Sequence, residues 1–398
     1  MLEEFTVDNY KSLINVTFRP RQQNLLLGMN NAGKTNLCQA LMFVGMSARS
    51  PLVDCAQLIA GGPFGMTNFY LGKTTIDFHV KASVPFSPVS TEPEILTFRY
   101  DLSLSYQPPR GADPSEVLQV ESESLRVSGV SFDEVELLSN TRSGGYRLLN
   151  ETSHFRGDPD YVEGTIPRDA TMLSRLYDST AHPRAECFKR YLSRWQHYAI
   201  TPPGWRETGY QPHQFVLSSD GSNLASVIYH LKTTNEREYR NLLRHLQRIE
   251  PAVELINFFP PQQNYVFMFF EDRMGNRLHA ENASPGTLRF LAIAYVLFCQ
   301  PALAPPPLIV VEEPENGVYV GLFKDLVETL YELSNGPQVI FTSHSPYFID
   351  LFDTRLESVF VMKRGEKHSS LTQPDVATVK ARLEKFSLGE QHFREMLG

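Results

Sequence analysis

The sequence predicts an α/β protein with more than one lobe, and three observations lead to this fold class. A short apolar run, residues 24–27, ends at a glycine and precedes apolar residues at helical spacing, as in a buried strand that leads into a helix. Residues 76–165 alternate apolar and polar side chains between turn residues, which is typical of antiparallel strands with one wet face. Two further apolar strands, residues 308–311 and 339–342, each end in polar side chains. A chain of 398 residues can fill more than one hydrophobic core.

The loop after the first strand matches the phosphate-binding pattern G-x-x-x-x-G-K-[ST] and has the sequence GMNNAGKT. Its glycines let backbone N–H groups approach phosphate oxygens, and the helix that follows directs its positive N-terminus at the same oxygens. Lys34 is expected to reach the β- and γ-phosphates, and the Thr35 hydroxyl is expected to bind Mg²⁺. The predicted nucleotide-binding residues here are Gly28, Asn30, Asn31, Ala32, Gly33, Lys34, Thr35 and Asn36.

Acidic side chains and a histidine follow the two later strands. Glu312 and Glu313 stand at the end of one strand, where a nucleotide hydrolase needs a carboxylate for the metal and a base for water. His344 ends the other strand, and the carboxyl end of a parallel sheet is its ligand edge. A histidine alone would more often be a core or capping residue, but the three strand-end motifs together favour a functional one. Ser284 and Gly286 precede an apolar helix predicted over 288–298, where a hydroxyl and free N–H groups can bind an anion.

The middle of the chain predicts helices over 185–198, over 223–232 behind Ser222 as N-cap, and over 235–249. A loop over 107–115, which contains three prolines, joins two of the earlier strands. On the last of these helices, one outward side carries four arginines. They are Arg237, Arg240, Arg244 and Arg248. Three interpretations stay open: a solvated face, a contact with an acidic protein surface, or a contact with a DNA or RNA backbone, which the net charge of −8 disfavours.

Composition excludes several other classes of protein. Residues 290–311 lack a charged side chain over 22 positions, but Pro301 and the prolines at 305–307 divide them into a helix, a loop and a strand, so we predict no membrane span. Four cysteines without metal-binding or paired spacing indicate reduced thiols. The first residues lack a secretory signal, so a cytoplasmic location is expected.

Taken in order, these motifs resemble those of ABC-type ATPases, the group that includes the structural-maintenance-of-chromosomes, RecF and OLD (overcoming-lysogenisation-defect) proteins. The shared features are GxNNAGKT between a strand and a helix, a serine–glycine signature before a helix, EEPE after a strand, and a strand-ending histidine. Residues 5–13 (FTVDNYKSL) look like the opening strand of the group. Residues 219–224 (SDGSNL) and 312–317 (EEPENG) look like those of OLD-type predicted ATPases. The resemblance covers nearly the whole chain.

The resemblance implies a two-lobed ABC-type ATPase head, in which a mixed and parallel sheet with flanking helices carries β-rich and helical insertions. On this basis we expect ATPase lobe I over 1–75 and a β-rich antiparallel segment over 76–165. A helical insertion is expected over 166–252, and lobe II over 253–398 with the signature, the acidic pair and the histidine.

The resemblance also implies roles for individual residues, with ATP and Mg²⁺ as ligands. Lys34 and Thr35 correspond to the Walker A contacts, Glu312 and Glu313 to the Walker B pair with Glu313 as general base, and His344 to the switch histidine. Ser284 and Gly286 correspond to the signature that binds the γ-phosphate of ATP held by another copy, so binding would dimerise the heads. A metal-contacting glutamine is usual between the loop and the β-rich segment, and of Gln39 and Gln57, the only two there, Gln57 is the candidate.

Three residues depart from the group's pattern. Glu312 stands where aspartate is usual, and its extra methylene allows the Mg²⁺ contact to pass through water. Pro285 lies inside the signature, and Tyr319 replaces a histidine often seen after E-N-G. Because the lysine, the base and the histidine remain, slow hydrolysis is expected.

The resemblance further implies a role as a switch. OLD nucleases carry a metal-binding toprim domain after the ATPase, but only 54 residues follow His344 here, and residues 356–362 are predicted to form one last strand. We therefore expect a homodimer or higher oligomer, joined through its ATP sites, that controls a separate effector protein, a nuclease or toxin, in bacterial anti-phage defence. The alternative is a RecF-like clamp in DNA repair or maintenance; an ABC transporter motor is disfavoured because transporter heads lack these insertions.

Overall fold

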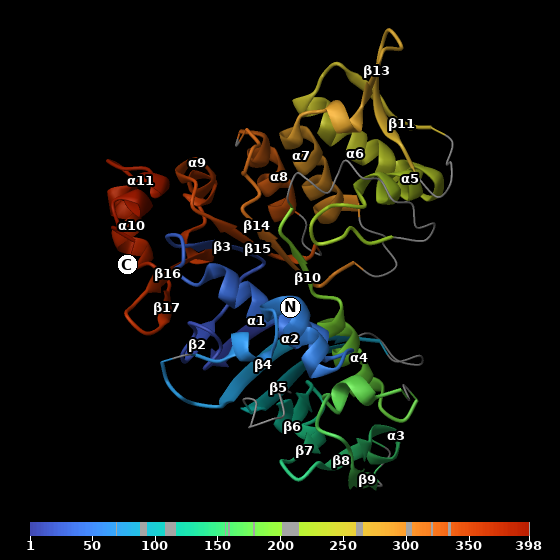
Figure 1. Cartoon of the computed structure of the whole chain (residues 1–398), viewed down its shortest axis with the longest axis vertical. Helices are drawn as coiled ribbons and strands as arrows, with labels where there is room; N and C mark the ends of the chain where they lie inside the picture. Colours follow the sequence, from blue (N-terminus) through green and yellow to red (C-terminus); the bar gives the residue numbers. More distant parts are fainter. Residues whose placement is uncertain are drawn as a thin grey trace, which may run out of the picture. The chain divides into compact units, whose positions relative to one another are not determined.

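The computed structural model of the chain contains two compact units (Figure 1). Unit 1 comprises Met1–Arg21, Gly28–Trp195 and Phe360–Gln373. Unit 2 comprises Gln22–Leu27, Gln196–Val359 and Pro374–Gly398. The structure describes residues 1–397 except 69, 88–93, 108–116, 156, 158–159, 178–179, 201–214, 260–265, 300–304, 320 and 333–335, and most of the predicted loop over 107–115 lies outside these residues.

Unit 1 is built on an antiparallel sheet of eight strands in the order β2-β1-β4-β5-β6-β7-β8-β9. The strands are β1 (Leu2–Asp8), β2 (Val16–Phe18), β4 (Thr75–Phe86), β5 (Glu94–Gln107), β6 (Val117–Ser128), β7 (Val135–Asn140), β8 (Gly145–Asn150) and β9 (Asp160–Thr165). Buried and less buried residues alternate along most of β4 and β5, as expected for strands with one face in the core. The prediction of antiparallel strands over 76–165 is confirmed.

Four helices accompany this sheet: α1 (Lys34–Ser47), α2 (Leu52–Ala60), α3 (Glu151–His154) and α4 (Pro183–Ser193). Aromatic rings join α1 and α4 to the buried face of the sheet. The rings of Phe43 and Phe78 stack with centroids 5.6 Å apart, and those of Phe98 and Phe188 with centroids 5.0 Å apart. A hairpin of β16 (Val359–Arg364) and β17 (Ser369–Thr372) also belongs to this unit, except for Val359, its first residue.

Unit 2 contains parallel strands in the order β10-β14-β15-β3. Their bounds are β10 (Gln196–Tyr198), β14 (Leu308–Glu312), β15 (Gln338–Ser343) and β3 (Gln23–Leu27). Every residue of β3 and β15 is buried, which explains their continuous apolar runs. The predicted strands over 24–27, 308–311 and 339–342 are therefore confirmed.

A second part of unit 2 pairs helices with a small antiparallel sheet (Figure 1). The sheet has the order β11-β12-β13, formed by Val253–Phe258, Met268–Asp272 and Arg277–His279. The helices of the unit are α5 (Leu224–Thr234), α6 (Glu236–Ile249), α7 (Pro285–Ala294), α8 (Gly321–Glu332), α9 (Pro346–Ile349), α10 (Val376–Arg382) and α11 (Leu388–Phe393). On α6 the four arginines are exposed while Tyr239, Leu242 and Leu246 are buried, which confirms the predicted orientation.

Four predicted boundaries differ from the structure. The helix expected over 185–198 ends at Ser193, and residues 196–198 instead form β10 because they pair with β14 and bury Tyr198. The N-cap position of helix α5 is Asn223 and not Ser222. Helix α7 starts at Pro285, three residues early, because Ser284 caps it. The strand expected over 356–362 begins at Val359, after a 3₁₀ turn.

The boundary between the units falls at Trp195, inside the segment 166–252 that we expected to form one helical insertion. Helix α4 belongs to unit 1, where the Phe188 ring contacts the β-sheet, and α5 and α6 belong to unit 2. Within the described residues, no helix is both long and apolar enough to cross a membrane.

Candidate functional site

The glycine-rich loop of unit 1 runs from Gly28 into α1. Gly33 is the N-cap of this helix and has a φ of 108°, and Asn31 has a φ of 63°. Both values lie in the left-handed region, which turns successive backbone N–H groups toward a common side. Met29, Asn30 and Asn31 are exposed, whereas Ala32 and Gly33 are buried. The exposed turn leads into the start of a helix of 14 residues, a geometry that suits an anion, and the binding of phosphates here stays a prediction.

Close packing under the loop explains why its two ends are glycines. A Cβ atom on Gly33 would lie 2.6 Å from the Ser369 Oγ and 2.9 Å from the Ser12 Oγ. A Cβ atom on Gly28 would lie 2.5 Å from the carbonyl oxygen of Met362. No side chain fits at these distances without displacing its neighbours. The loop is thus held by tight contacts with other parts of unit 1.

Lys34 is the first residue of α1 and is only 8% exposed. Its Nζ donates hydrogen bonds to the carbonyl oxygens of Gly28 at 2.6 Å and Met29 at 3.3 Å. The ammonium group is therefore held inside the loop, where phosphate oxygens could replace these carbonyls. Thr35 is exposed, and the Asn36 side chain donates to the Ser12 Oγ at 2.8 Å.

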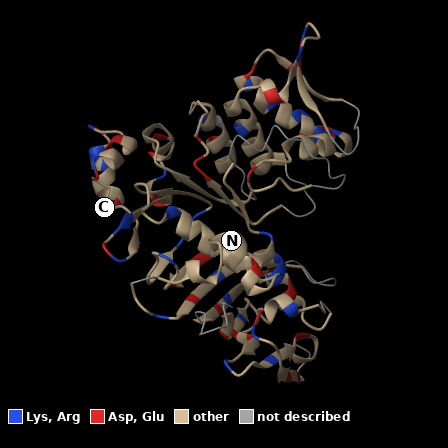
Figure 2. Cartoon of the chain, in the orientation of Figure 1, with Lys and Arg blue, Asp and Glu red and all other residues tan. Residues whose placement is uncertain are grey.

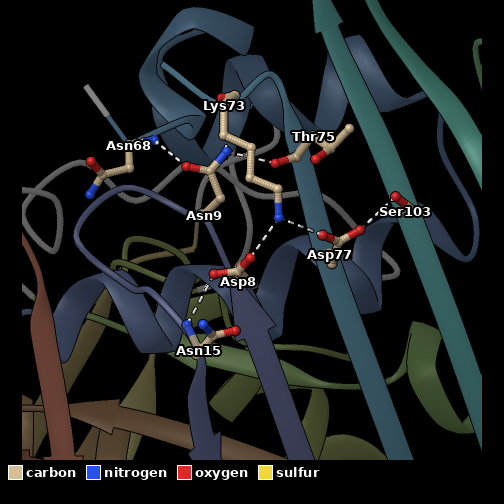
Figure 3. A network of polar contacts seen from close by, with 8 residues as sticks. All are labelled: Asp8, Asn9, Asn15, Asn68, Lys73, Thr75, Asp77 and Ser103. Atoms are coloured by element: carbon tan, nitrogen blue, oxygen red, sulfur yellow. Dashed lines mark hydrogen bonds and ion pairs between the residues drawn. The ribbon is translucent and has the colours of Figure 1, made fainter. Parts of the chain in front are cut away.

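A polar network anchors the segment that supplies Ser12 (Figure 3). Asn9 is fully buried with a φ of 58°, and its amide donates to the carbonyl oxygens of Lys73 at 2.9 Å and Thr75 at 2.6 Å. The Lys73 ammonium contacts Asp8 at 2.7 Å and Asp77 at 3.1 Å. Because the backbone of the segment is fixed in this way, Ser12 can bond Asn36 on one side and Ser369 on the other.

In unit 2, the carboxyl ends of three parallel strands meet at one edge. Glu312 at the end of β14 is in register with Thr342, and Ser343 at the end of β15 is in register with Leu27. Leu27 is the last residue of β3, so the chain leaves this edge directly into the glycine-rich loop. The acidic pair and His344 therefore stand at the edge of the sheet from which the loop departs, as the ligand-edge argument predicted.

Glu313 has an unusual backbone and a carboxylate with two partners. Its φ is 45°, a left-handed value that costs a residue with a side chain on the order of 1–3 kcal/mol. The Asn316 amide donates to its Oε2 at 2.5 Å, and the His344 Nδ1 lies 3.3 Å from its Oε1. The side chains of Glu313 and His344 are 33% and 45% exposed. Water can therefore reach a carboxylate that is already oriented by its neighbours.

Glu312 is held by a residue that the sequence did not suggest. The Nε2 of His197, on the edge strand β10, lies 2.6 Å from the Glu312 Oε1. We had predicted helix for residues 196–198, so no pairing between this histidine and β14 could be foreseen. The available signal in the sequence was the spacing of the apolar residues Trp195, Tyr198 and Ile200. All three are buried in the structure, whereas Gln196 and His197 are half-buried.

The third acid of the EEPE motif is structural. Glu315 is 6% exposed and accepts a hydrogen bond from the Ser343 Oγ. Burial raises the pKa of this carboxyl group, although the serine hydrogen bond and His344 favour its charged form. Ser343 also accepts from the backbone N–H of Ser345 at 3.0 Å. Glu315 thus connects the loop after β14 to the loop that carries His344.

The signature residues lie at the start of α7 and contact the loop after β14. The Ser284 Oγ caps the helix by accepting from the Gly286 N–H at 3.2 Å. A Cβ atom on Gly286 would lie 2.2 Å from the carbonyl oxygen of Gly317, so only glycine allows this approach. Arg289, which is 7% exposed, donates to the carbonyl oxygens of Asn316 and Ile200. The signature helix and the loop that carries Glu313 are therefore joined within unit 2.

The predicted metal ligands are oxygen donors of the kind that Mg²⁺ prefers. Thr35 and Glu312 supply a hydroxyl and a carboxylate, and Mg²⁺ usually keeps several waters and takes few protein ligands. No group of three or more His, Cys, Asp or Glu side chains that could hold a metal occurs in the described part of the chain. This donor set fits a Mg²⁺ ion that arrives with phosphates. Gln57 lies on α2 with an exposed side chain, and its role as a metal contact stays a prediction.

Comparisons with known proteins give one family match and similar solved structures. A family model described as "AAA domain, putative AbiEii toxin, Type IV TA system" matches residues 24–350. No curated protein matches the chain. A solved SmcHead bound to the C-winged helix domain of ScpA is 13% identical, with a TM-score of 0.52, and the match covers 95% of this chain and 99% of that chain. The SMC head domain from Thermotoga maritima is 10% identical, with a TM-score of 0.41 and coverage of 94% and 99%.

The likeness to the first of these structures concerns the fold. It confirms the predicted α/β fold, with mixed and parallel sheets and flanking helices, and this fold is similar to that of the SmcHead.

Proposed function

Because the chain belongs to this AAA-domain family, whose model spans most of it, we propose that it binds ATP with Mg²⁺ and hydrolyses it to ADP and phosphate. The observation that carries the proposal is the carboxylate of Glu313. It is oriented by Asn316 and His344, stays accessible to water, and stands at the sheet edge from which the glycine-rich loop departs. A base held in this way, at the sheet edge from which the chain continues into a phosphate-binding loop, is suited to activate water for attack on a phosphate.

Each residue then has a defined task. The N–H groups of the loop and the Lys34 ammonium bind the phosphates, and Thr35 and Glu312 hold the Mg²⁺ ion. The ion, when bound, neutralises negative charge on the phosphate oxygens. Glu313 accepts a proton from water while the water oxygen bonds to the γ-phosphorus and the bond from that phosphorus to the bridging oxygen breaks. His344, in contact with Glu313, fixes the carboxylate and senses the presence of the γ-phosphate.

We propose that a second copy of the chain completes the site. Ser284 and Gly286, at the N-terminus of α7, would bind the γ-phosphate of ATP held by the other copy. Both stand at the start of a helix of 10 residues, where N–H groups favour an anion. ATP would thus join two copies, and hydrolysis would separate them.

In the cell, this cycle would control a separate effector protein. The family's description names a toxin and a toxin–antitoxin system, and the solved SmcHead is bound to a protein partner. Both support a chain that acts through another protein, and we propose a nuclease or toxin effector in anti-phage defence. Co-purification with such a protein would support this role, whereas DNA-stimulated turnover without a partner would favour repair or maintenance.

Glu313→Gln tests the catalytic assignment. The amide cannot accept the proton, so turnover should fall at least about a hundredfold. ATP affinity should persist, and ATP-bound dimers should accumulate in size-exclusion chromatography. Lys34→Ala is the matched control, because it should weaken ATP binding itself and give no dimer. Undiminished turnover in Glu313→Gln would contradict the role of this residue, and ATP binding by Lys34→Ala at normal affinity would contradict the site.

A further inference from the structure

A hydrogen bond joins His197 to Glu312 in unit 2, and the proposed chemistry gives His197 no role. The strand β10 has three residues and pairs in parallel with β14, with His197 in register with Val310. From there its Nε2 reaches the Glu312 Oε1 at 2.6 Å. The two side chains are 22% and 15% exposed. A carboxylate can only accept, so the imidazole donates, and a donor–acceptor distance this short is typical of a charge-assisted hydrogen bond.

The length of the glutamate explains why the histidine can reach it. Aspartate is the usual residue at this position in the ATPases that the sequence resembles. An aspartate carboxylate would lie about 1.5 Å nearer the backbone, the length of one C–C bond. Without a shift of the strands, that carboxylate would move out of hydrogen-bond range of His197. The glutamate and the histidine therefore form a matched pair, in which the extra methylene brings the carboxylate to the imidazole.

The edge strand that carries His197 is itself anchored. Ile200, shortly after β10, accepts a hydrogen bond at its carbonyl oxygen from Arg289 of α7. The same guanidinium donates to the carbonyl oxygen of Asn316 in the loop after β14. Tyr198 is buried with 1% exposure. His197 thus projects from a fixed piece of backbone, which a residue that orients another side chain requires.

We propose that His197 is a positioning residue for Glu312 and that it fixes the carboxylate for Mg²⁺ binding. A long glutamate side chain has one more rotatable bond than aspartate, and an unheld carboxylate would lose rotamer freedom when it binds the ion. The imidazole restricts this freedom before the ion arrives. Hydrogen bonds from a neighbouring residue to a metal-binding carboxylate typically change metal affinity 10–100-fold. This inference rests on the proposed function, because it takes Glu312 as a ligand of Mg²⁺.

The experiment measures ATP binding as a function of Mg²⁺ concentration, with a fluorescent ATP analogue and no turnover. His197→Ala should raise the Mg²⁺ concentration for half-maximal binding about tenfold and leave the affinity without Mg²⁺ unchanged. His197→Gln, which keeps a donor N–H on a side chain of similar length, should recover most of the loss. Glu312→Asp should show the same shift, and the double variant His197→Ala/Glu312→Asp should be no worse than either single one, because the two changes remove one interaction.

A purely structural role of His197, as a clamp on the sheet edge, makes a different prediction. Gln196→Ala is the matched control on β10, since it removes the hydrogen bond that the Gln196 Oε1 accepts from the Tyr198 hydroxyl and leaves both His197 and Glu312 in place. This variant should lower the melting temperature without moving the Mg²⁺ dependence. If His197→Ala behaves like Gln196→Ala, or if the effects of His197→Ala and Glu312→Asp add, the inference is wrong.

The same titration separates this inference from the proposed function. Wild-type protein that binds no ATP, or binds it without regard to Mg²⁺, would overturn both. Wild-type protein that shows Mg²⁺-dependent ATP binding, abolished by Lys34→Ala but unchanged by His197→Ala, would overturn only the role of His197.

Discussion

Carboxylates in the two units have opposite surroundings. In unit 1, Glu123 and Glu151 are each 1% exposed and accept hydrogen bonds mainly from backbone N–H groups. In unit 2, Glu312 and Glu313 are 15% and 33% exposed and are contacted by histidine and asparagine side chains. The first pair satisfies the starts of helices, and the second pair stands at the open edge of a parallel sheet.

This difference separates the structural carboxylates of unit 1 from the carboxylates of unit 2 to which we propose roles in ATP hydrolysis. Burial raises the pKa of Glu123 to about 6 and the pKa of Glu151 to about 7, although hydrogen bonds favour their charged forms. A search for functional residues by perturbed pKa alone would therefore select Glu123 and Glu151, whose hydrogen bonds give them a structural role. In unit 2 the informative signs are geometric: the left-handed φ of Glu313 and the side chains that hold its two oxygens.

Among the variants that distinguish the carboxylates of unit 1 from those of unit 2, we expect Glu151→Ala to cause the largest loss of stability. The Glu151 carboxylate accepts from the N–H groups of Arg184 at 2.8 Å and Ala185 at 2.9 Å, at the start of α4. Its removal also leaves the Arg184 guanidinium, 3.7 Å away and stacked on the Phe155 ring, without this partner. We expect the free energy of unfolding to fall by about 3–5 kcal/mol. Denaturant titration measures it.

Glu313→Ala is the matched control for this comparison. It removes a carboxylate that is partly solvated, so the free energy of unfolding should change by less than about 1 kcal/mol. ATP turnover should respond in the reverse order, lost in Glu313→Ala and kept by the folded fraction of Glu151→Ala. If the free energy of unfolding falls equally in Glu151→Ala and Glu313→Ala, the distinction between structural carboxylates in unit 1 and solvated carboxylates in unit 2 is wrong.

The pH dependence of stability should also originate in unit 1. Burial raises the pKa of Glu151 from the ordinary glutamate value of 4.5 to about 7 in the folded protein. Because the folded value is raised, the stabilisation is complete below pH 4.5 and is lost as the pH rises through about 7. Between pH 7.5 and pH 5, the free energy of unfolding should gain about 2 kcal/mol from this residue.

Glu151→Gln isolates this contribution. The variant cannot titrate here, so the difference in its free energy of unfolding between the two pH values should shrink by about 2 kcal/mol, whatever its absolute stability. If the free energy of unfolding of Glu151→Gln still rises by about 2 kcal/mol between pH 7.5 and pH 5, groups other than Glu151 cause the pH dependence.

The two parts of the site were not equally accessible to sequence reasoning. The loop depends on backbone conformation, and glycine and lysine at fixed spacing encode it locally, so Gly33, Lys34 and the helix start could be predicted. The acidic edge, meaning Glu312, Glu313 and His344 at the carboxyl ends of β14 and β15, depends on contacts between residues far apart in the chain. His197 could not be found because residues 196–198 continue the helical pattern of α4, and only pairing with β14 makes them a strand. The contacts of Arg289 with Asn316 and Ile200 likewise require the fold.

Asn316→Ala tests the acidic edge directly. The Asn316 amide donates to the Glu313 Oε2 at 2.5 Å, and its loss frees the carboxylate to rotate. We expect kcat to fall about tenfold, equal to about 1.4 kcal/mol, with KM for ATP unchanged because a positioning contact acts on the chemical step. Asn316→Asp, of the same shape, should be worse, since a second negative charge repels Glu313. A raised KM with normal kcat would place Asn316 in substrate binding instead.

The smallest effect is expected at the arginines of α6, charged residues of unit 2 that lie outside the acidic edge (Figure 2). Arg240 pairs with Glu236 at 2.5 Å, with both side chains about 70% exposed, and Arg244 bonds the Asn241 side chain at 3.1 Å. Exposed pairs of this kind contribute up to about 1 kcal/mol, so the structure favours the solvated face. We therefore expect Arg240→Gln/Arg244→Gln/Arg248→Gln to change the free energy of unfolding by less than about 1 kcal/mol and to keep ATP turnover. Weaker nucleic-acid binding with a shallower salt dependence would instead reveal a phosphate contact, and loss of a co-purifying protein at normal turnover would reveal a partner surface.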